Sequence, residues 1–70
     1  MDPQLARDLR RMALHLETAS VLELRAQRST DPAQVTVLRR RAEQRRAEAA
    51  RIRDRLSTLG VALRAPSPRG

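Results

Sequence analysis

Arginine is the residue type best able to do chemistry in this chain, and eight arginines lie between residues 39 and 55. Guanidinium groups bind phosphates through planar, paired hydrogen bonds, so an arginine-rich helix is a candidate for contact with RNA or DNA. On such a surface the residues expected to touch phosphate are Arg39, Arg40, Arg46 and Arg51. This hypothesis pictures two copies of the chain joined in a four-helix bundle.

The spacing of the charges favours a solvated helix over a nucleic-acid surface. The arginines scatter around the helix, and Glu43, Glu48 and Asp54 each lie three or four residues from an arginine. Ion pairs at that spacing stabilise a solvent-exposed helix. The chain also has no aromatic residue on which a base could stack. We therefore rank nucleic-acid binding second.

An aliphatic row in the first half of the chain favours a protein partner. Leu14 and Val21 are seven residues apart and Leu24 follows, on a side of the helix turned away from the row that starts at Leu5. A two-helix hairpin cannot bury both sides of one helix, so this second row is expected to be covered by a partner. We expect Leu14, Val21 and Leu24 to be the main contacts. The secondary contacts are expected to be Leu22, Val35 and Val37.

No residue pattern indicates catalysis, a metal or a cofactor. His15 is the only histidine and has no cysteine or suitably spaced carboxylate beside it, so a metal site is not expected. None of the hydroxyl residues is placed with a base and an orienting acid. There is no glycine-rich phosphate loop. We expect a protein that is not an enzyme.

Two Asp-Pro pairs define the elements that must position these residues. Aspartate is a strong N-cap and proline suits the first helical position, so Asp2-Pro3 and Asp31-Pro32 each predict a helix start. Gln34 lies three residues after the second cap, as in a capping box. The pattern predicts helices at about 3–28 and 32–59, a turn at 29–31, a helix end at Gly60 and a disordered tail over 64–70.

Each predicted helix carries an apolar seam with three- and four-residue spacing. The first comprises Leu5, Leu9, Met12, Leu16, Ala19 and Ala26; the second comprises Leu38, Ala42, Ala49, Ile52, Leu56 and Leu59. Glu23 interrupts the first seam and Arg45 the second. They could pair with each other or with Arg41, although we favour both pointing outward at the seam edge. The short turn makes the helices antiparallel, so the predicted fold is an all-α, coiled-coil-like hairpin in residues 1–63.

Size and composition point to a partner-stabilised, cytoplasmic protein. The chain has 70 residues, a net charge of +7, and neither cysteine nor aromatic residues. A core this small, without staples, is marginal, so we expect a partner subunit, or a second copy when the chain is alone, to stabilise the hairpin. No apolar run is long enough to span a membrane, and the N-terminus lacks the regions of a signal peptide.

The start of the second helix resembles the YscE-type proteins of bacterial type III secretion systems. In that family helix 2 opens with Gln, then two bulky residues separated by one position, then a large apolar residue. Gln34, Val35, Val37 and Leu38 occupy those places. The family often has aromatics at the two bulky positions and fewer arginines.

The resemblance implies a small co-chaperone. Such proteins pair with a tetratricopeptide-repeat chaperone, and together the two keep the secretion needle subunit soluble before export. The needle subunit would then be an indirect partner. A generic coiled-coil adaptor without a chaperone role is the further alternative.

Overall fold

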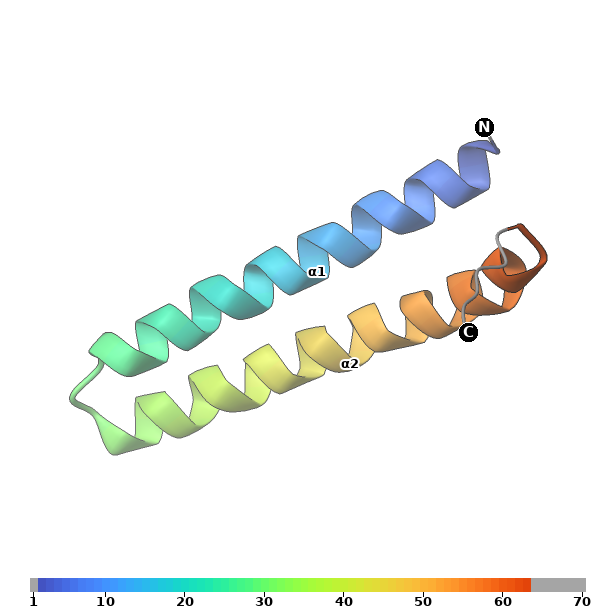
Figure 1. Ribbon diagram of the computed structural model, residues 1–70. Helices are drawn as coiled ribbons and strands as arrows, with labels where there is room; N and C mark the ends of the chain where they lie inside the picture. The colour runs from blue at the N-terminus through green and yellow to red at the C-terminus, as the bar shows by residue number, and fades with distance from the viewer. Residues whose placement is uncertain (1, 64–70) are drawn as a thin grey trace, which may run out of the picture.

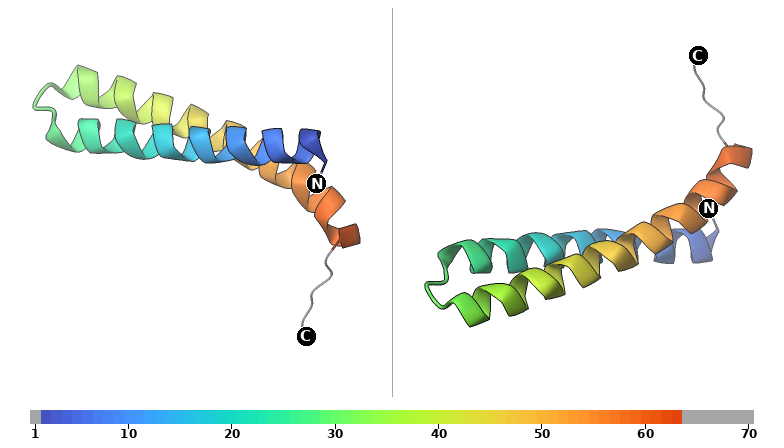
Figure 2. Two further views of the ribbon diagram at one scale, coloured as in Figure 1. Left: turned by 90° about the horizontal axis from the view of Figure 1, so that it is seen from above. Right: turned by 90° about the horizontal axis from the view of Figure 1, so that it is seen from below.

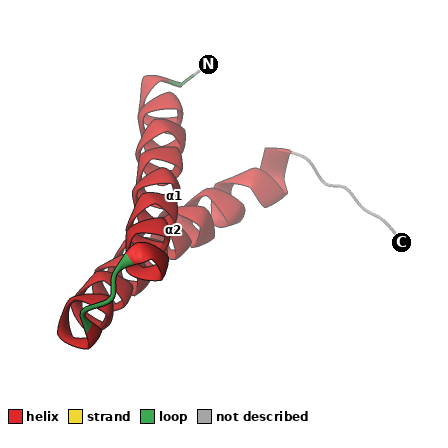
Figure 3. Ribbon diagram, turned by 90° about the vertical axis from the view of Figure 1, so that its left-hand side faces the viewer, coloured by secondary structure: helices red, strands yellow, loops and turns green. Residues whose placement is uncertain are grey.

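The computed structural model describes the backbone of residues 2–63 and the side chains of residues 2–58. It contains α1, Pro3–Arg28, and α2, Pro32–Leu63, which run antiparallel and side by side from a tight turn (Figure 1). The two helices cross at an angle and diverge towards the open end of the hairpin (Figures 2 and 3). The predicted all-α hairpin is confirmed.

Both helices begin where aspartate caps them. The Asp2 carboxylate accepts a hydrogen bond from the backbone N–H of Gln4 at 3.0 Å, and the Asp31 carboxylate accepts one from Ala33 at 3.1 Å. Gln34 does not complete a capping box, because its Oε1 accepts from the Ser29 hydroxyl at 2.9 Å. Ser29 Oγ in turn accepts from the backbone N–H of Asp31. The turn is therefore held by Ser29 where the capping-box pattern predicted Gln34.

The cap at Asp31 gives a direct test of this start signal. Asp31→Ala should lower the free energy of unfolding by about 0.5–2 kcal/mol, because the first-turn N–H groups lose their acceptor. Urea denaturation followed by circular dichroism measures the change. Asp31→Asn keeps an acceptor and is the matched control. Equal losses for the two variants would show that the cap hydrogen bond is not what stabilises the turn.

The second helix continues past Gly60 to Leu63, so the prediction that Gly60 ends it is wrong. Glycine permits the left-handed conformation that ends helices but does not require it. Inside a helix it costs only about 1 kcal/mol relative to alanine. The predicted disordered tail, residues 64–70, lies outside the described residues.

The seam of α1 contains Leu5, Met12, Ala19 and Ala26 as predicted and differs from the prediction at the positions between them. Its buried or half-buried members alternate three and four residues apart and are Leu5, Asp8, Met12, His15, Ala19, Leu22 and Ala26. Leu9 and Leu16, which we expected in the seam, are exposed. Leu22, expected at the surface as a secondary partner contact, is buried in the core instead.

Packing next to the turn fixes this phase. The core cluster lies there and consists of Ala19, Leu22, Ala26, Leu38 and Ala42. In the opposite phase Glu23 would replace Leu22 in this cluster, and burying an unpaired carboxylate costs several kcal/mol. A regular helix keeps the same side towards its neighbour along its whole length. Towards the open end of the hairpin, Asp8 and His15 therefore face α2, and Leu9 and Leu16 face solvent.

The seam of α2 follows the prediction. Leu38, Ala42, Ala49 and Ile52 are buried, and Leu56 is half-buried. The side chain of Leu59, the last predicted member, lies outside the described part of the chain. Arg45 occupies the expected interruption and is exposed.

Candidate functional site

The aliphatic row on the outer side of α1 is exposed as expected. Leu14, Val21 and Leu24 are 57%, 54% and 49% exposed. At about 100° per residue they lie roughly 130–150° from the centre of the seam that faces α2. A surface turned this far from α2 receives no cover from the rest of the hairpin. These three side chains therefore form an apolar surface that the fold leaves open on the outer side of α1.

A shallow hollow lies beside the first residue of this row. It has a volume of about 450 Å³ and is lined by Arg7, Arg10, Arg11, Ala13, Leu14 and Glu17, all from α1. Its floor is apolar, because arginine side chains lay their aliphatic stems along the surface and hold their charged ends in water. Such a hollow suits an apolar side chain of a partner, with charges at the rim.

The three residues predicted as secondary partner contacts differ in their exposure. Val37 is exposed at 48% and is available to a partner, whereas Val35 is half-buried and packs against the core cluster. Leu22 belongs to that cluster. Of the three, Val37 alone is exposed. It lies near the turn on α2, apart from the row on α1.

Leu9 and Leu16 are exposed aliphatic residues that the sequence analysis placed in the core. They precede Glu23 by multiples of seven residues and so share its side of α1. The signal that could have revealed them is the equal spacing of the two possible seams. Each row carries a carboxylate, Glu23 in one and Asp8 in the other, so charge did not decide between them either.

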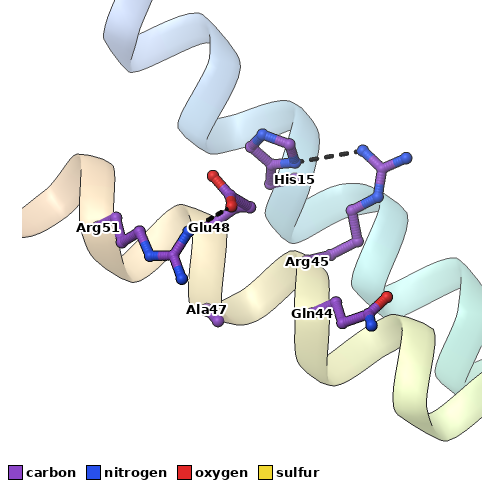
Figure 4. A pocket seen from close by; sticks show the side chains of 6 residues that line it. All are labelled: His15, Gln44, Arg45, Ala47, Glu48 and Arg51. Carbon is purple, nitrogen blue, oxygen red and sulfur yellow. Dashed lines mark hydrogen bonds and ion pairs between the residues drawn. The ribbon is translucent and has the colours of Figure 1, made fainter.

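Polar contacts cross between the helices on both edges of the seam. Arg46 Nη1 donates to Glu23 Oε2 at 2.8 Å on one edge. On the other edge Arg45 Nη1 lies 3.2 Å from His15 Nδ1, as Figure 4 shows. A guanidinium has no acceptor, so a hydrogen bond between these two atoms requires His15 Nδ1 to accept. The less favoured alternative, a pair of Glu23 with Arg45 or Arg41, is not formed, because Glu23 pairs with the neighbouring Arg46.

The arginines proposed for phosphate contact do not share one face. Arg39 and Arg46 lie on one side of α2, and Arg40 and Arg51 lie about a third of a turn away. Arg46 is committed to Glu23, and Arg51 donates to Glu48 at 2.7 Å. The predicted pair of Glu48 with Arg51 is confirmed. Asp54 contacts Arg53 at 3.6 Å, where the spacing suggested Arg51.

The described residues, 2–63, contain neither of two further kinds of site. None of the helices there is long and apolar enough to cross a bilayer. No cluster of three or more potential metal ligands occurs among the same residues.

Comparison with known proteins returns no relative: the chain matches no protein-family model, no curated protein and no solved structure at a significant level.

Proposed function

We propose that this chain is a protein-binding subunit that docks the outer side of α1 onto a helical partner. The observation that carries the proposal is the exposure of Leu14, Val21 and Leu24 on the side of α1 opposite α2. Three large aliphatic side chains within one helix surface are the kind of patch that protein interfaces cover. The hollow at Leu14 supplies a receptor for one apolar side chain of the partner.

The small core supports the same proposal. Among residues 2–58, most of the buried apolar residues are alanines, and the large ones are Leu22, Leu38 and Ile52. Burial of a large aliphatic side chain contributes about 1.5–3 kcal/mol, so a core this poor leaves little margin over the entropy of ordering the chain. A partner on α1 would add the burial that the hairpin lacks.

The likeness of Gln34–Leu38 to YscE-type proteins extends the proposal to a role. In that role the hairpin is a co-chaperone that stabilises a helical-repeat chaperone, which in turn holds the type III secretion needle subunit. Val37 would contribute from α2, since its side chain is exposed. This extension rests on the resemblance alone.

Charge substitution on the outer side of α1 tests the docking surface. Val21→Asp combined with Leu24→Asp should abolish the partner complex and leave the hairpin helical, because both side chains are exposed in the free chain. Desolvating two carboxylates in an apolar interface costs several kcal/mol, a loss of a thousandfold or more in affinity. The measurement is recovery of the partner on the tagged chain from its native cells, with circular dichroism for helicity.

Leu9→Asp combined with Leu16→Asp is the matched control, with the same added charge on another side of the same helix. It should retain the partner. Retention by the Val21 and Leu24 variant would remove these residues from the interface. Recovery only of material that disappears with nuclease would favour the nucleic-acid hypothesis in place of the protein partner.

A further inference from the structure

One row of α1 places two aliphatic residues between two arginines. Arg7, Leu14, Val21 and Arg28 follow one another at seven-residue intervals and share a side of the helix. The row is about 32 Å long, at 1.5 Å per residue. We propose that it binds an acidic amphipathic helix of the partner, apolar at its centre and carrying carboxylates towards both ends. This inference rests on the proposed function and specifies the chemistry of the partner.

The geometry at the first end of the row shows how such a helix would be held. The hollow at Leu14 has an apolar floor and a rim formed by Arg7, Arg10 and Arg11, with Glu17 as its only acidic group. An apolar side chain of the partner can occupy the floor while its acidic neighbours meet the guanidinium groups. Guanidinium groups pair with carboxylates through two parallel hydrogen bonds, which also fixes orientation.

The arginines of this row form no ion pair with the chain's own carboxylates, and Glu17 is the one acidic residue of α1 that lies on the same side. Within the described residues, four carboxylates form ion pairs elsewhere: Asp8 with Arg11 and Arg55, Glu23 with Arg46, Glu48 with Arg51 and Asp54 with Arg53. Among those same residues the arginines on the outer side of α1 that form no ion pair are Arg7, Arg10, Arg25 and Arg28. A partner that brings carboxylates to the two ends of the row, where these arginines lie, therefore gains attraction there, whereas a carboxylate at the centre would meet Glu17.

The same pattern argues against a second copy as the occupant. Arg7 and Arg28 lie at opposite ends of the row, so either orientation of a second α1 would place arginine beside arginine. Like charges across an interface are unfavourable. Nucleic acid would satisfy the arginines but would leave Leu14 and Val21 against phosphate and sugar. The acidic amphipathic helix satisfies both parts of the row.

Synthetic helices test the proposal with the full chain. Three peptides share one leucine seam and differ only in the residues flanking it, which are Glu, Gln or Lys. Binding to the labelled chain is followed by fluorescence anisotropy at low and at physiological salt. We expect the Glu peptide to bind about tenfold more tightly than the Gln peptide, from two or three exposed charge pairs, and the Lys peptide to bind most weakly. The preference should shrink as salt rises.

Two pairs of variants assign the effect to residues. Arg7→Gln with Arg28→Gln should reduce the preference for Glu over Gln to about threefold or less, because the ends of the row become neutral. Arg39→Gln with Arg53→Gln removes the same charge from α2 and should leave the preference intact. Leu14→Gln should weaken all three peptides alike.

Several outcomes would overturn the proposal. One is that the three peptides bind equally well and that Leu14→Gln weakens them all. The row would then be a docking surface that does not select its partner by charge. Equal loss of the preference in both arginine pairs would mean that net charge alone attracts the peptide. No detectable binding of the Glu peptide, or its displacement by duplex DNA in an Arg7- and Arg28-dependent way, would also contradict it. Failure of the proposed function is detected separately, by retention of the native partner in the Val21→Asp, Leu24→Asp variant.

Discussion

Replacing Ala42 with leucine should destabilise the hairpin by overpacking the contact between its two helices. Ala42 is fully buried and lies in the cluster formed by Ala19, Leu22, Ala26 and Leu38. Small residues on both helices let the backbones approach closely at this point. Three additional heavy atoms would force the helices apart next to the turn, where the chain cannot yield, at a cost of about 1–3 kcal/mol.

Thermal unfolding followed by circular dichroism measures this effect. For a chain of this size a loss of 1 kcal/mol lowers the melting temperature by about 4–8 °C, so the expected shift is large. Ala47→Leu is the matched control, because Ala47 is exposed on the opposite side of the same helix. The control should change stability by no more than about 0.5 kcal/mol. Equal melting temperatures for the two variants would contradict close helix contact at Ala42.

The start and end of α1 and the start of α2 were predictable from the sequence because local chemistry determines them. Each start needs only an aspartate and the N–H groups two residues later, and the structure shows both hydrogen bonds. The end of α2 was not predictable in the same way. Gly60 satisfies the local rule for a helix end, yet the helix continues to Leu63. Glycine permits a helix to end but does not make it end, so a glycine alone is a weak predictor of a helix end.

The phase of the α1 seam was not predictable, because two rows with equal spacing overlap in the sequence. One contains Leu9 and Leu16, and the other contains His15 and Leu22. The first looks more apolar, but it places Glu23 in the core. The choice depends on contacts between residues distant in sequence, such as Arg46 with Glu23 and Arg55 with Asp8. Spacing within one helix carries no information about those contacts.

The exposure of the candidate interface was predictable for the same geometric reason. Leu14, Val21 and Leu24 lie far from both possible seams, so the change from one seam to the other leaves them exposed. Leu22 lies close to the seam boundary, and the same change of phase moved it into the core. Residues opposite a seam are thus robust predictions, whereas those at its edge depend on three-dimensional contacts.

Replacing Asp8 with leucine should stabilise the hairpin, although Asp8 is the one buried charged residue among those described. Its Oδ1 forms no hydrogen bond, and the nearest guanidinium atoms are Arg55 Nη2 at 3.6 Å and Arg11 Nη1 at 4.0 Å. These contacts are too long to offset the loss of water around a carboxylate. Both arginines are more than half exposed and stay hydrated without it. The expected gain is about 1–4 kcal/mol.

A double-mutant cycle with Arg55 tests whether Asp8 lowers stability, as expected, or raises it through its pair with Arg55. In the wild-type chain Arg55→Gln should lower stability, because the buried Asp8 carboxylate loses its nearest cation. In the Asp8→Leu background the same change should have almost no effect, since Arg55 then has no acidic partner on α1. Asp8→Asn keeps a buried polar group and should gain less than Asp8→Leu. A loss of stability in Asp8→Leu, measured by urea denaturation, would mean that the Asp8–Arg55 pair holds the open end of the hairpin together.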